Sequence, residues 1–367
     1  MMGIAVNGPL RLGIAGANPE RGWFRDAHFP ALQRVPGLAV HAVSARTQDI
    51  ADAAAATFGA RLAYDDSLAL ARDPGVDIVA VTVKVPEHRA IVLAALAAGK
   101  HVYCEWPLGR DLAEAEEMTE AARAAGVHVA IGLQGANSPA VRHAAALVQA
   151  GAIGKPLSLR VVSSTAGWGA AAPPNYAYLQ DRSNGATLAT IAGGHTLAMV
   201  EAVVGGFARV SALNSILQDQ ITIIGSDNMV KRTCADHMLI LGQHRGGCVS
   251  SVEIVGGAAI PLCYELRGTD GTLAINGHHP GGYQCGHLTV TTEPPSPPQP
   301  EPAVAGLEGN PLNVAQLWAV FGQDIRTGTR TVPDFAAALR LTRLLDAIDR
   351  ASDLRHEVTL AAEQEAK

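Results

Sequence analysis

Residues 10–133 alternate short apolar runs with alanine-rich stretches, and this alternation constrains the fold more than any other feature of the sequence. The runs LRLGIAG (10–16) and IVAVTV (78–83) have the length of strands, and the second is as apolar as a parallel strand covered on both faces. Helical stretches such as TQDIADAAAATFG (47–59) separate the runs and end at glycine. The pattern predicts an α/β fold that begins with a Rossmann domain, a doubly wound parallel sheet, over residues 9–134.

The pattern changes after Gln134, where longer runs with strand alternation dominate. DHMLILGQH (236–244) is one of several such runs, and PPSPPQPEP (294–302) predicts a surface loop. NVAQLWAVFGQDIRTG (313–328) and DFAAALRLTRLLDAIDRAS (334–352) predict two closing amphipathic helices. We therefore expect a second α/β domain over residues 135–357, with a large, mainly antiparallel open sheet.

Composition narrows the class of protein. The net charge is −6 and Lys and Arg do not cluster, which argues against nucleic-acid and anionic-membrane partners. Five cysteines without a Cys-x-x-Cys pair indicate neither a disulfide framework nor a zinc site, and no metal is expected. The first residues, MMGIAVNG, lack a basic region, and no apolar run reaches the ~20 residues of a membrane helix. The expectation is a cytoplasmic protein with a short N-terminal tail.

The loop after the first strand, GANPERGW (16–23), is a weak match to the dinucleotide fingerprint G-x-G-x-x-G. Gly16 fits the first glycine, Asn18 replaces the second, and Gly22 fits the third with one extra residue. Asn tolerates positive φ better than most residues, so the loop can still present N–H groups to phosphate. We predict cofactor contacts from these three residues and Trp23; the alternative is an ordinary turn with two useful glycines.

The end of the second strand, VSARTQD (43–49), bears on the choice of cofactor. NAD sites place an acidic residue here for the ribose 2′-OH, whereas an Arg suits a 2′-phosphate. Ser44, Arg46 and Thr47 occupy the tip, and no acid precedes Asp49. These three residues are predicted to bind NADP, with NAD possible. The alternative is that Arg46 is a solvated residue at the start of a helix.

AGKHVYCEWP (98–107) resembles the signature AGKHV-x-C-E-K-P of the glucose–fructose oxidoreductase/inositol dehydrogenase (Gfo/Idh/MocA) superfamily, and the closing helices resemble those of that family. The resemblance implies a Rossmann domain, a second α/β domain and a homodimer or homotetramer formed through the open sheet. GANPERGW (16–23), LQGANSP (133–139) and GATLATIAGGHTL (185–197) resemble the branch of the yeast galactose-regulon repressor, in which Trp also replaces the signature Lys. That repressor branch implies NAD(P) binding in a regulator.

The resemblance also implies which residues carry chemistry. The signature Lys, a proton donor or acceptor beside the nicotinamide, is Trp106 here, and an indole cannot exchange protons as an amine can. His195 fits the family's second acid/base, but Ile191 stands where its Asp partner belongs. His195 remains a catalytic candidate because imidazole suits proton transfer near neutral pH. Lys84, at the carboxyl end of a parallel strand, is the second catalytic candidate.

The remaining candidates are contacts rather than acid/base groups. Trp106 can stack on the nicotinamide or a sugar ring. Tyr176, Tyr178 and His237 are predicted substrate contacts, the last because strand alternation places only one of Asp236 and His237 toward a pocket. Cofactor contacts are also predicted from Lys84, His88, Glu105 and Trp106. Packing is the alternative for Trp106, for each tyrosine and for His195, and Glu105 has the alternative of fixing the turn. For Lys84 as an acid/base, the alternative is a lysine that reaches solvent or a cofactor phosphate.

Two functions follow. The first is an NADP-dependent oxidoreductase that moves a hydride between nicotinamide and a carbonyl, hydroxyl or imine carbon. The family resemblance implies a sugar-like or cyclic small-molecule substrate. The second is a non-catalytic NAD(P)-binding regulator, which the loss of the signature Lys favours. A Rossmann fold by itself cannot decide between them, and we favour the enzyme because His195 and Lys84 are present.

Overall fold

The computed structural model describes residues 8–361, so most of the expected N-terminal tail lies outside the described residues. The chain forms two compact units. The first extends to Asn137 and also includes Pro302–Arg340, and the second comprises Ser138–Glu301 and the chain from Leu341. The units therefore differ from the two continuous ranges expected from the sequence, because a late segment packs with the first unit.

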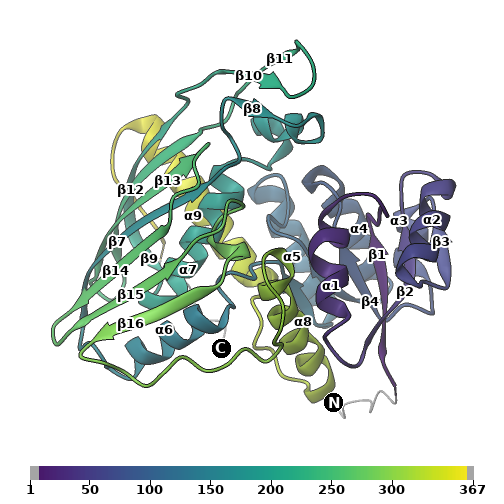
Figure 1. The fold of residues 1–367 in the computed structure, drawn as a ribbon, viewed down its shortest axis with the longest axis horizontal. Coiled ribbons are helices and arrows are strands. Elements are labelled where there is room, and N and C mark those ends of the chain that lie inside the picture. Colours follow the sequence, from purple (N-terminus) through teal and green to yellow (C-terminus); the bar gives the residue numbers. More distant parts are fainter. Residues whose placement is uncertain (1–7, 362–367) are drawn as a thin grey trace. The chain divides into compact units, whose positions relative to one another are not determined.

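Within the described residues, the first unit contains a six-stranded parallel sheet in the order β3-β2-β1-β4-β5-β6 (Figure 1). This is the strand order of the doubly wound dinucleotide-binding fold, as predicted. The strands are β1 (Leu10–Ala15), β2 (Leu38–Ser44), β3 (Leu62–Tyr64), β4 (Ile78–Val81), β5 (His101–Cys104) and β6 (Val129–Ile131). The helices are η1 (Phe24–His28), α1 (Phe29–Leu32), α2 (Gln48–Phe58), α3 (Ser67–Arg72), α4 (Val85–Ala97), α5 (Leu112–Ala125) and α8 (Asn310–Thr327).

Helix α8 belongs to the first unit because its apolar face completes the Rossmann core. Trp318 is fully buried and stacks on Tyr103 of β5, with ring centroids 4.3 Å apart. Phe321 and Val314 lie in the same apolar cluster as Phe24. Burying an indole and a phenyl ring here contributes several kcal/mol, at roughly 25 cal/mol per Å² of apolar surface. Amphipathicity alone indicated a helix but not which sheet it covers.

Within the described residues, the second unit contains an eight-stranded sheet in the order β16-β15-β14-β7-β13-β12-β9-β17. β13 pairs with β7 in parallel and the other neighbours pair antiparallel, as expected for a mainly antiparallel sheet. The strands are β7 (Pro156–Thr165), β9 (Phe207–Ser215), β12 (His237–His244), β13 (Val249–Gly256), β14 (Leu262–Gly268), β15 (Thr272–Gly277), β16 (Leu288–Glu293) and β17 (Val358–Thr359).

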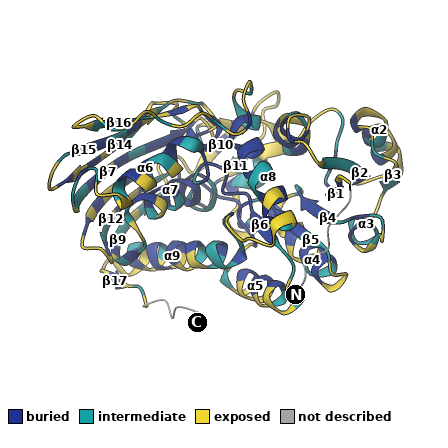
Figure 2. Ribbon diagram, turned by 90° about the horizontal axis from the view of Figure 1, so that it is seen from below, coloured by how far each residue is buried: buried dark blue, intermediate teal, exposed yellow. Residues whose placement is uncertain are grey.

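Helices cover one face of this sheet and leave the other open (Figures 1 and 2). On β12, Met238 and Ile240 are buried, whereas Leu239 and Leu241 are 43% and 62% exposed. The covering helices are α6 (Pro139–Gln149), α7 (Gly194–Val204) with the preceding π-turn η4 (Ala189–Gly193), and the C-terminal part of α9 (Phe335–Leu354).

A smaller sheet lies beside the main one in the second unit, in the order β11-β10-β8. It consists of β8 (Ala171–Ala172), β10 (Gln220–Ile223) and β11 (Met229–Lys231), which the sequence pattern did not predict. The short helices η2 (Pro174–Gln180) and η3 (Arg182–Asn184) follow β8, and η5 (Tyr283–Cys285) precedes β16. Among the described residues, no helix is both long and apolar enough to cross a membrane.

Candidate functional site

The loop after β1 is fixed to the ends of two neighbouring strands. Gly16 has φ +96°, and a Cβ there would lie 2.7 Å from Cγ1 of Val83. Only glycine fits both the backbone angle and this space. The N–H groups of Gly16 and Ala17 donate to the carbonyl oxygen of Ser44, at 3.1 and 2.9 Å. The first glycine of the fingerprint therefore has a structural reason that does not depend on the cofactor.

Asn18 changes what the loop presents. Its side-chain Oδ1 accepts hydrogen bonds from the backbone N–H groups of Glu20 and Arg21, at 2.9 and 3.2 Å. The loop was expected to present N–H groups to a phosphate, and Asn18 satisfies these two of them within the loop. Gly22, at φ +106°, has open space around its Cα, and Trp23 beside it is half-buried. The indole N–H of Trp23 is buried without a hydrogen-bond partner among the described residues.

The three residues predicted at the end of β2 have different environments. Ser44 is fully buried and its hydroxyl lies 2.8 Å from the hydroxyl of Ser67, so its side chain does not reach a ligand. Thr47 caps α2 by accepting from the N–H of Ile50 at 3.5 Å. Arg46 is exposed at the tip of the turn. Of the three, only Arg46 presents a charged group to solvent.

Lys84 is the N-cap residue of α4 and is exposed at the carboxyl end of β4. His88, one turn into the same helix, is buried. Its Nε2 lies 3.1 Å from the carbonyl oxygen of Val83, and its Nδ1 lies 3.0 and 3.3 Å from those of Pro107 and Leu108. Burial lowers its pKa. His88 was predicted to contact the cofactor. Instead, its ring links two turns, the one that contains Lys84 and the one that follows β5.

Trp106 lies in that second turn and is buried. The turn is anchored by α5, where Asp111 caps the N–H of Glu114 at 3.0 Å. The Glu114 carboxylate accepts from the backbone N–H of Arg110 at 2.8 Å and from its guanidinium at 2.6 and 2.8 Å. This reciprocal cap restricts the turn.

Glu105 takes part in a buried relay that sequence reasoning missed. The indole N–H of Trp318 donates to Nδ1 of His28 at 2.9 Å, and Nε2 of His28 lies 2.8 Å from Oε1 of Glu105. Because an indole N–H can only donate, Nδ1 is an acceptor and Nε2 carries the proton given to Glu105. The relay fixes the carboxylate at the carboxyl end of β5. His28 and Trp318 are 290 residues apart, so no local pattern pointed to it.

His195 stands in the first turn of α7 in the second unit and is 5% exposed. Burial lowers its pKa to about 3. Its Nδ1 is buried without a hydrogen-bond partner among the described residues, consistent with Ile191 in place of a carboxylate. The hydroxyl of Tyr283 donates to the carbonyl oxygen of His195 and fixes the backbone there. At neutral pH the ring is therefore neutral.

The other predicted substrate contacts lie in the same unit. Tyr176 and Tyr178 are in η2; Tyr176 is 51% exposed, and burial raises the pKa of Tyr178 to about 12. His237 shares the open face of the sheet with Leu239 and lies 3.2 Å from the carboxylate of Glu253. The helix that carries His195 covers the opposite face, near Met238 and Ile254. His237 is therefore separated from His195 by the sheet.

The carboxyl edge of the Rossmann sheet suits a dinucleotide. A glycine loop closely approaches the turn after β4, Arg46 and Lys84 supply exposed cationic groups, and Glu105 is held by His28. Ligands of doubly wound sheets bind outside this edge. The residues present thus fit a nicotinamide dinucleotide. Among residues 8–361, no group of three or more His, Cys, Asp or Glu side chains could hold a metal ion.

Comparison with known proteins agrees with this geometry. Residues 10–133 match the family described as "Oxidoreductase family, NAD-binding Rossmann fold", and residues 139–277 match the "Gal80p, C-terminal domain" family. The dehydrogenase aclE of Aspergillus oryzae is 32% identical over 228 residues, 60% of this chain and 62% of that protein. The galactose/lactose metabolism regulatory protein GAL80 of Saccharomyces cerevisiae is 26% identical over 294 residues, 73% of this chain and 67% of that protein.

The chain thus matches about two thirds or less of the length of these curated relatives. A solved levoglucosan dehydrogenase, in complex with NADH and levoglucosan, has the same fold, with a TM-score of 0.81 and 22% identity over 96% of this chain and 100% of that one. The N-terminal family match agrees with the parallel sheet and its glycine loop, and the C-terminal family match agrees with the second unit. Residues 10–133 thus resemble the NAD-binding Rossmann domain of the Gfo/Idh/MocA oxidoreductases, and residues 139–277 resemble the C-terminal domain of Gal80p.

Proposed function

We propose that this protein is an NADP-dependent oxidoreductase. It moves a hydride between the nicotinamide and a carbonyl, hydroxyl or imine carbon of a sugar-like or cyclic small molecule. The observation that carries the proposal is the carboxyl edge of the Rossmann sheet, where His88 joins the turn of Lys84 to the turn of Trp106. The dehydrogenases among the relatives support the reaction class, and the levoglucosan complex supports a sugar-like substrate.

Arg46 decides the cofactor in this proposal. Its exposed guanidinium stands where a ribose 2′-phosphate would be recognised, and no carboxylate competes before Asp49. Arg46→Ala should weaken NADPH binding by about tenfold to a hundredfold, equal to about 1.5–3 kcal/mol for a charged hydrogen bond. NADH binding should change little. Equal loss for both cofactors, or no loss for either, would reject the NADP assignment and leave NAD as the cofactor.

The proton that is exchanged with the substrate alongside hydride transfer is assigned to the chain's own residues. A bound nicotinamide would supply only the hydride transfer. Lys84 supplies an amine that can exchange a proton, which the indole of Trp106 cannot. His195 is neutral at physiological pH, so it can accept from or donate to a substrate hydroxyl but holds no second proton to give. Lys84 is therefore the preferred acid/base, and His195 orients the hydroxyl.

Other contacts complete the proposal. Trp106 provides a flat apolar surface for a ring, and Tyr176 and Tyr178 provide hydroxyls for polar contacts of the substrate. A homodimer or homotetramer would cover the exposed leucines on the open face of the second sheet, where Leu213 pairs with Leu239. A cytoplasmic location remains the expectation from the sequence.

The second candidate is a non-catalytic NAD(P)-binding regulator. Two features favour it: Trp106 replaces the amine of the family signature, and Nδ1 of His195 has no partner among the described residues. The relative GAL80 is a regulatory protein. In this reading the turn of Trp106 binds the cofactor without reacting.

Turnover separates the two candidates. Purified protein is mixed with NADPH and a panel of sugar lactones, ketoses, cyclic ketones and imines, and oxidation is followed by the absorbance of the reduced nicotinamide. An enzyme should consume NADPH only with a particular substrate. Lys84→Met should then lower kcat by about 10²–10⁴, while Lys155→Met, a matched change at an exposed lysine of the second unit, should not. Tight NADPH binding without consumption would favour the regulator.

A further inference from the structure

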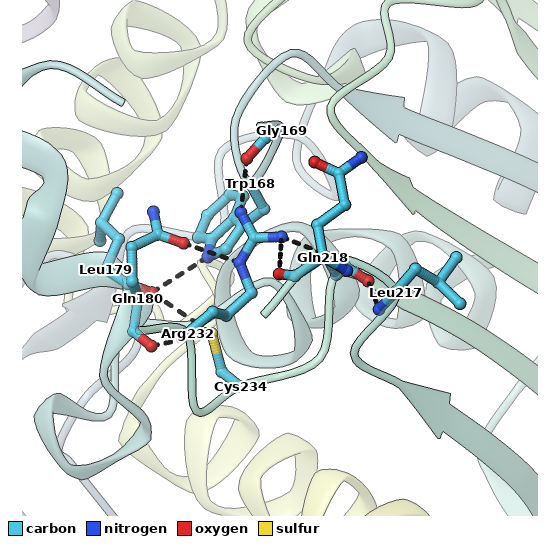
Figure 3. A network of polar contacts seen from close by, with 9 residues as sticks. Trp168, Gly169, Leu179, Gln180, Leu217, Gln218, Arg232 and Cys234 are labelled. Carbon is cyan, nitrogen blue, oxygen red and sulfur yellow. Dashed lines mark hydrogen bonds and ion pairs between the residues drawn. The ribbon is translucent and has the colours of Figure 1, made fainter. Parts of the chain in front are cut away.

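Arg232 is a buried arginine that the proposed function does not use. It is 1% exposed and lies in the loop between β11 and β12 (Figure 3). Its Nε donates to the side-chain oxygen of Gln180 at 3.0 Å, and one terminal nitrogen donates to the carbonyl oxygen of Gly169 at 2.6 Å. The other terminal nitrogen donates to the carbonyl oxygen of Gln218 at 3.1 Å. A single guanidinium thus bonds to three separate segments of the second unit.

The carboxylate of Asp236 balances the positive charge of Arg232. Its carboxylate lies 2.6 Å from the same terminal nitrogen of Arg232 and accepts the backbone N–H groups of Leu217 and Gln218 at 2.8 and 2.9 Å. The ion pair is therefore buried and well bonded. Buried ion pairs are weak evidence for stability, because apolar residues of similar volume often serve as well. Such a pair, unlike apolar packing, holds the groups bonded to it at fixed distances and angles.

The segment most constrained by this network is the end of η2. Three consecutive carbonyl oxygens of η2 each accept from a different part of the second unit (Figure 3 shows the contact between Trp168 and Leu179). Asn184 donates to Tyr178 at 3.0 Å, the indole of Trp168 donates to Leu179 at 3.1 Å, and the N–H of Thr233 donates to Gln180 at 2.9 Å.

Trp168 itself has φ +59°, a left-handed backbone that bulky residues rarely adopt. It holds this conformation next to Gly169, whose carbonyl oxygen Arg232 binds. The network therefore holds both ends of the stretch from Trp168 to Gln180. Tyr176 and Tyr178 lie inside that stretch.

We propose that Arg232 is a positioning residue that fixes η2, so that Tyr176 and Tyr178 meet the substrate in one arrangement. This inference rests on the proposed function for the identity of the ligand, but the fixing of η2 does not depend on turnover. Arg232 does not touch the substrate in this proposal; it acts through Gln180 and Gly169.

The test compares three variants. Arg232→Lys keeps the charge but cannot reach Gln180, Gly169 and Asp236 together, because an ammonium lacks the planar fork. The double variant Arg232→Met/Asp236→Leu removes both charges and leaves apolar packing. Arg209→Lys, at an exposed arginine of the same unit that lies 3.3 Å from Glu357, is the matched control. Amide hydrogen exchange of residues 174–184 is measured for each, with β13 as the internal reference.

Exchange in residues 174–184 should accelerate about tenfold or more in both Arg232 variants and not in Arg209→Lys, with β13 unchanged. For a substrate identified by the panel, the KM of both Arg232 variants should rise about tenfold, while their kcat and their Kd for NADPH change less than about threefold. If the lysine variant loses the whole fold of the second unit, the charge-free double variant decides. Unchanged exchange in residues 174–184 of a folded Arg232 variant would overturn the proposal. Failure of the wild type to turn over any substrate would count against the proposed function instead.

Discussion

Replacing His195 by leucine should make the protein more resistant to acid. In the folded protein burial lowers the pKa of His195 to about 3, whereas in the unfolded chain it is about 6.5. Below pH 6.5 the unfolded chain binds a proton that the folded protein refuses, so stability falls as the pH falls. At pH 5, which lies 1.5 units below the unfolded pKa, His195 lowers the free energy of unfolding by about 2 kcal/mol, at about 1.4 kcal/mol per unit. At pH 7.5 this loss of stability is close to zero.

The assay is urea unfolding of wild type and His195→Leu at pH 7.5 and pH 5. The difference in free energy of unfolding between variant and wild type should shift by about 2 kcal/mol in favour of leucine at the lower pH. His356→Leu, the same change at an exposed histidine of the second unit, is measured beside it as the matched control. Parallel pH profiles for His195→Leu and wild type would refute the reasoning, since they would mean that the ring is protonated in the fold.

Three further predictions concern the first unit. Gly16→Ala should lower the free energy of unfolding by about 2–3 kcal/mol, because the new Cβ would lie 2.7 Å from Val83 and because alanine disfavours the φ of +96°. Gly22→Ala, where the space is open, should lower it by only about 1 kcal/mol. Urea unfolding measures both changes. His88→Ala should cost about 2–4 kcal/mol and weaken NADPH binding, measured by nicotinamide fluorescence, and an unchanged Kd would show that the two turns do not need this link. Glu105→Leu should destabilise the first unit more than Glu105→Gln, because only glutamine retains an acceptor for His28.

The sequence was sufficient for the order of elements around the candidate cofactor edge. Hydrophobic periodicity and glycine stops are local, and parallel strands end at one edge of their sheet, so Gly16, Arg46, Lys84 and Trp106 were expected near strand ends and lie there. The mainly antiparallel second sheet was predicted in the same way. Those inferences needed only residues within about twenty positions of one another along the chain.

Other assignments depended on distant neighbours. Ser44 and His88 stand at positions where a cofactor contact was reasonable, yet their side chains turn inward, one to Ser67 and the other to backbone carbonyl oxygens of the next turn. Asn18 satisfies amides that the fingerprint would leave to a phosphate. A side chain's partner is set by the geometry of the whole unit, which local spacing does not specify.

By itself, the sequence determined the fold class, the family resemblance and the loss of the signature amine at Trp106. Only the tertiary structure decided that α8 completes the Rossmann core, that Trp318 and His28 hold Glu105, and that Arg232 ties η2 to two other segments. The physical reason is the range of the interactions. Helix and strand patterns arise between neighbours in the chain, whereas buried polar groups must find whichever partner the folded core brings to them, here up to 290 residues away.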